Sequence, residues 1–278
     1  GPLSYSLGLP APLSVFHLND TRDSVEISEL GLNGERNSRR LATVDNHPLY
    51  RGYGTHFSFI WVGSPPQRVS VIMDTGSHWT AFPCKKCQCG QHMDSFFDPQ
   101  KSSTSKTLKC AGGRRCPFSQ SYSEGSSWRA YKVNDKVWVG GAQRSKAYNG
   151  SKLSIPFTFG CQERETGLFK TQIVDGIMGL SASADTLPFQ LFAQKATSTR
   201  MFGLCLRVGG GIVTLGGVEE RLNQAEALLP DKPTTTQTTH SPFQWASLVK
   251  SSGWFTVKLI AIEMQDPLTG KIETVSKD

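Results

Sequence analysis

The amino-acid sequence predicts an all-β fold, and three observations support this prediction. The 278-residue chain is 37% hydrophobic and 10% aromatic, and its 27 glycines and 15 prolines supply many turns. Short segments with alternating apolar residues recur between these turns, as in β-strands. Only one short segment reads as a helix. A chain of this length can form one large domain or two ordinary ones.

The first predicted strands form a hairpin that leads to an aspartate. Apolar and polar residues alternate over residues 55–61, and the Gly-Ser-Pro-Pro sequence at 63–66 then turns the chain. Alternation resumes over residues 69–73, and Asp74 follows directly. We therefore expect Asp74 at the end of a buried strand.

Later segments extend the β pattern. One short helix is predicted at residues 187–195, with Pro188 in its first turn. The threonine-rich residues 233–242 lack periodicity and are predicted to be an exposed loop or a connection between lobes. Further strands are predicted at residues 131–139, 153–159, 204–208, 212–215 and 255–264.

Residues 1–46 differ in character from the rest of the chain. They begin with Gly-Pro-Leu, which resembles the remnant of an engineered cleavage site, and continue with acidic stretches. The dibasic pair Arg39-Arg40 favours a removable propeptide that is cleaved after Arg40. The alternative is an ordinary frayed terminus.

Several features indicate a secretory or extracellular protein. Glycosylation sequons at Asn19 and Asn149 accompany a high number of cysteines, which suits an oxidising compartment. Apolar runs are far shorter than the roughly 18 residues of a membrane span. The net charge of +7 is spread along the chain, which argues against nucleic-acid binding. The seven cysteines are Cys84, Cys87, Cys89, Cys110, Cys116, Cys161 and Cys205.

The sequence Asp74-Thr75-Gly76-Ser77 can carry peptide hydrolysis by paired carboxylates. Two aspartates that share one proton can activate a water and polarise a carbonyl group. Gly76 allows the sharp turn that leaves backbone amides free to hold the carboxylate. Thr75 can hydrogen-bond into a facing loop, and Ser77 can donate to the carboxylate. Alone, this four-residue motif is weakly specific.

The wider context resembles the pepsin-like aspartic proteases, over residues 48–264. Residues 63–77 resemble the first active-site hairpin, and residues 174–181 resemble the strand that threads beneath it. Residues 120–126 resemble the flap, which assigns the flap tyrosine to Tyr122. The cysteine-rich segment 84–92 is similar to the branch that includes plasmepsin V and the nepenthesins.

This resemblance implies a bilobal, all-β pepsin-like fold. Residues 47–220 would form a complete N-terminal catalytic lobe with its flap, and residues 221–278 would begin the C-terminal lobe. Only one Asp-[Thr/Ser]-Gly sequence occurs, at Asp74. The second catalytic aspartate is therefore expected in the C-terminal lobe, as a continuation or a separate chain, and this fragment alone is predicted to be inactive.

One departure from the family concerns the flap. Family members place a tryptophan seven residues after the catalytic aspartate, where it hydrogen-bonds the flap tyrosine, but this chain has Ala81 there. The flap must therefore be held in another way. Trp79 can substitute for the missing tryptophan, or it can simply pack in the core.

Seven cysteines leave one unpaired if the others form disulfides. The resemblance implies that this one is Cys205, because in the similar branch a cysteine on this strand pairs with one in the second lobe. The other six allow 15 connectivities, and resemblance to the family implies a Cys84–Cys161 bridge. An alternative interpretation is a metal site, because Cys84, Cys87, Cys89 and His92 have ligand-like spacings. The sequons and the cysteine number favour disulfides.

The leading functional hypothesis is a secreted aspartic endopeptidase in zymogen form. It would cleave protein or peptide substrates through an Asp74-activated water and would require no metal or organic cofactor. The alternative is a non-catalytic binding or inhibitor protein on the same fold, since fold does not fix function. A secreted interaction partner with a protease relic ranks lowest.

Overall fold

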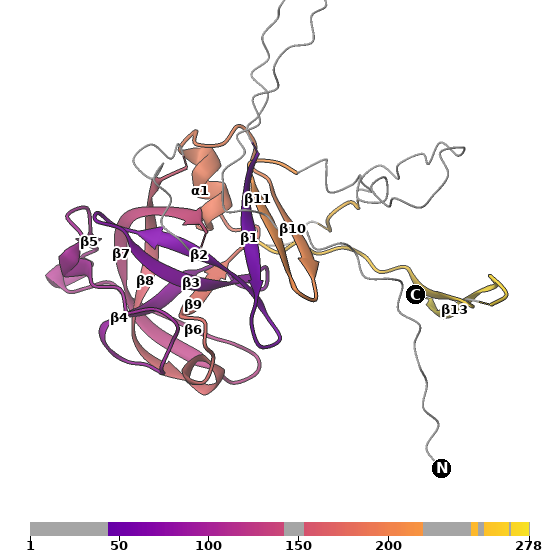
Figure 1. Ribbon diagram of the computed structural model, residues 1–278, viewed down its shortest axis with the longest axis horizontal. Coiled ribbons are helices and arrows are strands. Elements are labelled where there is room, and N and C mark those ends of the chain that lie inside the picture. Colours follow the sequence, from indigo (N-terminus) through magenta and orange to yellow (C-terminus); the bar gives the residue numbers. More distant parts are fainter. Residues whose placement is uncertain (1–43, 142–152, 219–245, 250–252, 267, 278) are drawn as a thin grey trace, which may run out of the picture. The chain divides into compact units, whose positions relative to one another are not determined.

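The computed structural model describes residues 44–141, 153–218, 246–249, 253–266 and 268–277 (Figure 1). The predicted cleavage site at Arg40, the sequons at Asn19 and Asn149, and the threonine-rich loop lie outside the described residues. Within them, no helix is long and apolar enough to cross a membrane.

The described residues are mostly β-structure. The α-helix α1 covers Leu187–Ala193, and short 3-10 helices cover Pro99–Lys101, Ala111–Gly113 and Gly167–Lys170. The strands are β1 (Asp45–Arg51), β2 (His56–Val62), β3 (Gln67–Asp74), β4 (Thr80–Gln88), β5 (Lys106–Thr107), β6 (Pro117–Ser121), β7 (Ser127–Gly140), β8 (Ile155–Thr166), β9 (Gly176–Gly179), β10 (Phe202–Arg207), β11 (Gly210–Leu215), β12 (Ala261–Gln265) and β13 (Ile272–Lys277).

Eleven of the strands form one sheet in the order β10-β11-β1-β2-β3-β9-β4-β8-β7-β5, with β6 paired to β7. Figure 1 shows β1, β10 and β11 side by side, and β12 pairs with β13 in a separate hairpin. The all-β prediction is thus confirmed. The short strand β9 lies between β3 and β4, parallel to β3 and antiparallel to β4.

The predicted hairpin before Asp74 is confirmed. Strands β2 and β3 pair antiparallel, and residues 63–66 form the turn. Six of the seven β2 residues are buried, because β2 pairs with both β3 and β7 and is covered on both faces. Ser58 is one of them, and its hydroxyl donates to the Pro48 carbonyl oxygen at 3.0 Å. The serine can therefore lie in the interior without an unsatisfied donor.

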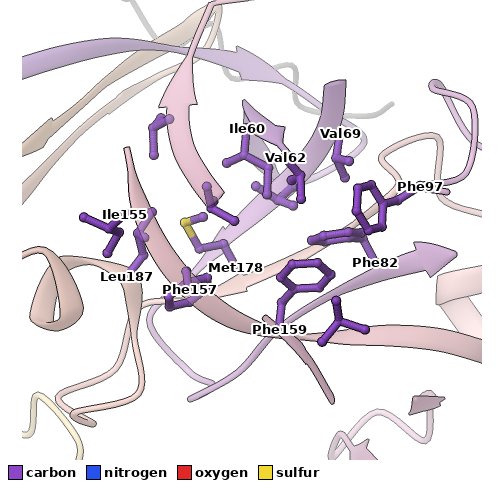
Figure 2. Close-up of a cluster of buried hydrophobic side chains, with 14 of the residues drawn as sticks. Ile60, Val62, Val69, Phe82, Phe97, Ile155, Phe157, Phe159, Met178 and Leu187 are labelled. Carbon is purple, nitrogen blue, oxygen red and sulfur yellow. The ribbon is translucent and has the colours of Figure 1, made fainter. Parts of the chain in front are cut away.

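The hydrophobic core lies inside the curved sheet (Figure 2). Phe82 stacks on Phe159 at 4.5 Å between ring centroids, and Phe97 packs edge-on against both rings. Offset and edge-to-face arrangements of this kind are the favourable geometries for aromatic pairs. The other core residues labelled in Figure 2 are Ile60, Val62, Val69, Ile155, Phe157, Met178 and Leu187.

Several predicted boundaries differ from the structure, and three of the differences are large enough to need a reason. Helix α1 ends at Ala193 rather than at residue 195, where Lys195 adopts a φ of 60° that a helix cannot continue. Strand β8 runs to Thr166 because it pairs along the long strand β7. The strand predicted at residues 255–264 was wrong over its first half, since the structure begins β12 at Ala261.

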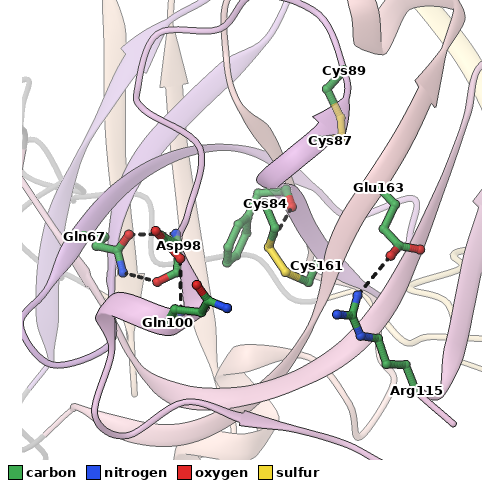
Figure 3. Close-up of a disulfide and its surroundings, with 10 residues drawn as sticks. Gln67, Cys84, Cys87, Cys89, Asp98, Gln100, Arg115, Cys161 and Glu163 are labelled. Atoms are coloured by element: carbon green, nitrogen blue, oxygen red, sulfur yellow. Dashed lines mark hydrogen bonds and ion pairs between the residues drawn. A yellow bond between two sulfur atoms is a disulfide. The ribbon is translucent and has the colours of Figure 1, made fainter.

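The cysteines form three disulfides. Cys84–Cys161 joins the neighbouring strands β4 and β8, which confirms the pairing implied by resemblance (Figure 3). Cys87–Cys89 and Cys110–Cys116 close short loops, and Cys205 is free and exposed. The three thiols of the alternative metal site are thus used in disulfides, and His92 instead contacts Glu165 at 3.0 Å. These four side chains therefore do not form a metal site together in this structure.

Two glycines allow β9 to pack closely against its neighbours, Gly179 against the loop that follows Asp74 and Gly176 against β4. A methyl group on Gly179 would lie 2.7 Å from the Ser77 carbonyl oxygen and 2.5 Å from the His78 carbonyl carbon. A methyl group on Gly176 would lie 2.6 Å from the Cβ atom of Phe82. Because backbone atoms set the closest of these distances, the neighbours cannot easily move away.

Buried charges fasten the same strand. Asp175 immediately precedes β9, and its carboxylate accepts hydrogen bonds from the amide and hydroxyl of Ser70, both at 2.6 Å, and from the Asp94 amide at 2.9 Å. Burial raises the pKa of Asp175 to about 6, against the lowering effect of these hydrogen bonds. The proton is therefore bound more tightly in the folded chain than in the unfolded one.

A second buried pair lies nearby. The imidazole of His92 contacts the Glu165 carboxylate and the Gln172 carbonyl oxygen, both at 3.0 Å. Burial lowers the pKa of His92, but the hydrogen bond and charge of Glu165 outweigh it, so the pKa is raised. Both acceptors favour the doubly protonated ring.

We expect Gly179→Ala to destabilise the folded chain by at least about 1–3 kcal/mol, the usual cost of overpacking. Gly209→Ala is the control, because nothing lies within 4 Å of a methyl group there. Urea unfolding measures both. Equal midpoints for the two variants would contradict the steric argument.

We also expect stability to fall as the pH rises. The folded pKa of Asp175 lies above its unfolded value of 3.8, so its contribution is complete below pH 3.8 and is lost as the pH rises through about 6. The raised pKa of His92 acts in the same direction above its unfolded value of 6.5.

Melting temperatures between pH 3.5 and 8 check this expectation. Asp175→Asn should flatten the curve between pH 4 and 6, whereas Asp185→Asn, at an exposed position, should leave it unchanged. The same slope in both variants would exclude Asp175 as its source.

Candidate active site

Asp74 is the last residue of β3 and is half-buried, while Thr75 and Gly76 are exposed. The Gly76 amide donates to Asp74 Oδ1 at 2.9 Å. The Asp74 carbonyl oxygen accepts from the Leu180 amide at 2.7 Å, which ties the loop to the end of β9. The carboxylate is therefore held by local backbone geometry at the end of an interior strand.

The Ser77 side chain differs from expectation. Its hydroxyl is buried and forms no hydrogen bond within the described residues, so it does not donate to Asp74. The Ser77 carbonyl oxygen accepts from the Ser181 amide at 3.1 Å, which fixes the backbone of the loop to the segment after β9.

Asp74 also borders a hollow of about 300 Å³. One wall comes from β3 and the turn before β2, and the other comes from β10. Most of its large side chains are apolar, including Ile72, Met73, Leu204 and Leu206. An apolar hollow beside a single carboxylate is the usual composition of a site that binds an organic ligand.

The segment predicted as a flap is a hairpin of β6 and β7. The Tyr122 amide donates to the Ser126 carbonyl oxygen at 2.9 Å, and the Gly125 amide donates to the Tyr122 carbonyl oxygen at 3.0 Å. Gly125 has a φ of 93°, which favours glycine at this turn. Tyr122 therefore begins a tight turn at the tip of the hairpin.

The Tyr122 ring packs against Phe169, with 5.3 Å between centroids. Burial raises the pKa of Tyr122 to about 12, and the negative charge of Asp74 adds to this increase. The phenol is thus neutral at any physiological pH. It can both accept and donate a hydrogen bond.

Trp128 holds the flap tyrosine. Its indole Nε1 donates to the Tyr122 hydroxyl at 3.3 Å, and its ring is 1% exposed. Ala81, at the position of the family's tryptophan, belongs to the same hydrophobic cluster as Trp128 and leaves room for that ring. In this chain the donor to the Tyr122 hydroxyl therefore comes from β7, within the same hairpin as Tyr122.

The donor to Tyr122 among the described residues is Trp128, and Trp79 fits the packing alternative. It meets Phe118 edge-on at 4.7 Å, and Phe118 meets Trp128 edge-on at 5.1 Å. The Lys132 ammonium lies 4.8 Å from the Trp79 ring centroid. Trp128 lies six residues after Tyr122, just beyond the predicted flap at residues 120–126, and no sequence pattern marks it as the donor.

The chain matches the xylanase inhibitor N-terminal family over residues 56–217, which includes Asp74, the flap and β9. It is 35% identical over 222 residues to aspartic protease 5 of Toxoplasma gondii, covering 66% of this chain and 22% of that protein. It is 32% identical over 199 residues to plasmepsin V of Plasmodium falciparum, covering 65% of this chain and 33% of that protein.

A plant relative shows the same relationship. Aspartic proteinase nepenthesin-1 of Nepenthes gracilis is 32% identical over 174 residues, which cover 58% of this chain and 39% of that protein. The matched part thus spans between about a fifth and two fifths of these relatives. The chain belongs to the xylanase inhibitor N-terminal family of pepsin-like domains, in the branch that includes plasmepsin V and the nepenthesins.

Proposed function

We propose that this chain supplies one half of the active site of an aspartic endopeptidase. The observation that carries the proposal is the fixing of Asp74, whose carboxylate accepts from the Gly76 amide while its backbone is bonded to Leu180. A carboxylate held in this way can activate a water without reorganising during the reaction.

The reaction needs a second carboxylate that shares a proton with Asp74. The ionised member takes a proton from water as the water attacks the peptide carbonyl carbon, and the protonated member donates to the carbonyl oxygen. Collapse of the resulting intermediate breaks the C–N bond, and the amine leaves with a proton. We assign the second carboxylate to a C-terminal lobe that residues 221–278 begin, following an N-terminal lobe at residues 47–220.

Tyr122 is proposed to close over the bound peptide. Its neutral hydroxyl, supported by Trp128, can hydrogen-bond a substrate close to Asp74. Thr75, Gly76 and Ser77 are proposed to shape the loop around the carboxylate. This chemistry requires protein or peptide substrates and no metal or organic cofactor.

A secretory route and a zymogen form are also proposed. The three disulfides suit an oxidising compartment. We propose glycosylation at the sequons of Asn19 and Asn149 and propeptide cleavage after Arg40 as parts of this route.

The second candidate function is an inhibitor or other binding protein on the same fold. The family that the chain matches is named for xylanase inhibitors, and this name favours the second candidate. The presence of the full Asp74-Thr75-Gly76-Ser77 sequence favours the protease.

We expect Asp74→Asn in the intact protein that carries this chain to lower kcat for casein hydrolysis at acidic pH by at least about 10³-fold. Asp185→Asn, at an exposed position outside the loop, should retain activity. An inactive wild-type protein that instead binds and inhibits a xylanase would favour the second candidate.

We expect Trp128→Phe to reduce kcat/KM about threefold to tenfold, because it removes one hydrogen bond of about 0.5–1.5 kcal/mol and keeps an aromatic ring. Tyr122→Phe should have a similar effect, and the double variant should lose little more. Trp79→Phe serves as a matched control. Additive losses in the double variant would show that the two residues act separately.

A further inference from the structure

The outer side of the flap sheet carries cations that face each other. Arg129 on β7 is directly opposite Arg164 on β8, and both are exposed. Neither forms an ion pair with another described residue. Like charges placed directly opposite each other in an antiparallel pair are destabilising by up to about 1 kcal/mol. The sheet therefore retains an arrangement that costs stability.

A second facing pair lies beside the first. Lys109 and Arg115 form an isolated antiparallel bridge across the loop closed by the Cys110–Cys116 disulfide, and both are exposed. The disulfide prevents this loop from opening to separate the charges. Two pairs of cations are thus held close together by the backbone.

Among the described residues, the acid that pairs with one of these cations is Glu163, and it compensates only part of the charge. Glu163 contacts Arg115 at 3.3 Å, with both side chains more than half exposed (Figure 3). Exposed pairs of this kind contribute little, typically below about 1 kcal/mol. The guanidinium of Arg115 also stacks over Tyr131 at 4.4 Å, which holds it over an aromatic surface.

A hollow of about 190 Å³ lies between the cations. Arg115, Arg129 and the acid Glu163 line it together with Pro117, Phe118 and Tyr131, so charged groups, two of them basic and one acidic, border apolar ones. The volume is below the roughly 300–1,000 Å³ of pockets that enclose a small molecule. It suits one apolar side chain of a longer ligand.

Strand β6, which borders the hollow, has free backbone groups along the edge that faces away from β7. It pairs with β7 along one edge, and no other described strand pairs with it. Ser119, at its centre, is opposite Arg129 and also borders the hollow. An unpaired edge can bind an extended peptide as an added strand.

We propose that this surface, defined by Arg115, Arg129, Arg164, Lys109, the hollow and the edge of β6, binds an extended acidic segment of a partner polypeptide. Its backbone would pair with the free edge of β6, an apolar side chain would enter the hollow, and its carboxylates would reach over β6 toward Arg115 and Arg129. Arg164, one strand further on, would add only to the positive potential of the surface. A polysaccharide or a membrane would use the charge but not the free strand edge. The proposal does not depend on the catalytic one.

The test uses the intact protein with Asp74→Asn, so that cleavage cannot interfere. Fluorescence anisotropy would measure binding of a fluorescein-labelled octapeptide of alternating glutamate and leucine at 50 and 200 mM NaCl. We expect binding that weakens severalfold at the higher salt concentration. The same peptide with glutamine in place of glutamate should bind at least tenfold more weakly.

Arg129→Glu separates binding from folding. It should weaken peptide binding at least tenfold, yet the urea midpoint should stay the same or rise, because glutamate would face Arg164 across the strands. Arg51→Glu, at an exposed position on β1, is the control that changes net charge equally and should bind like the parent.

Three results would overturn the proposal: equal binding of the glutamine peptide, equal binding by the Arg129→Glu protein, or Arg129-dependent binding of heparin or phosphatidylserine vesicles without binding of the acidic peptide. Each result would leave casein cleavage by the wild-type protein unaffected. Conversely, an inactive wild-type protein that binds the peptide would count against the protease and not against this surface.

Discussion

The threading of β9 between β3 and β4 is the constraint on which the rest of the structure depends. It fixes Asp74 through the Leu180 amide, and it requires glycine at positions 176 and 179 because the chain above leaves no space for a side chain. A parallel pair such as β3 and β9 needs a long connection, and here the chain from the end of β3 to the start of β9 provides it. The flap, β8 and both cysteines of the buried Cys84–Cys161 bridge lie in that connection.

The buried ionisable groups around β9 make the stability of this part of the fold depend on pH. Asp175 holds the start of β9 against β3. His92 connects Gln172, which lies shortly before β9, to Glu165 on β8. Both groups bind a proton more tightly in the folded chain than in the unfolded one. A pair of catalytic carboxylates also works only while one of them keeps its proton. The stability of the fold and the proposed chemistry therefore favour the same side of neutrality, although different residues are responsible.

The sequence was most informative where structure is determined locally. Alternation, a Gly-Ser-Pro-Pro turn and an aspartate at a strand end are neighbours in the chain, so the hairpin before Asp74 could be predicted from the residues themselves. The Cys84–Cys161 bridge spans 77 residues, and only resemblance to a family could imply it. The donor to Tyr122 was missed, because a tryptophan on a hairpin is usually explained by packing alone. Residues 255–260 have the composition of a strand, but within them the structure forms only an isolated bridge, between Val257 and Leu248, and composition does not reveal how far such pairing extends.

Strand β7 shows how one segment can serve two separate purposes. Successive side chains point to opposite faces, so Trp128 and Ala130 are buried beside the flap tyrosine while Arg129 between them faces outward. The bulge opposite Arg129 and Ala130 places an extra residue, Glu163, in β8. Two neighbours, Glu163 and Arg164, are consequently both exposed, and the acid can reach Arg115 while Arg164 stays opposite Arg129. Substitutions on the outer face can therefore change its charge without altering the buried contact between Trp128 and Tyr122, which allows binding on that face to differ among proteins that share the same flap.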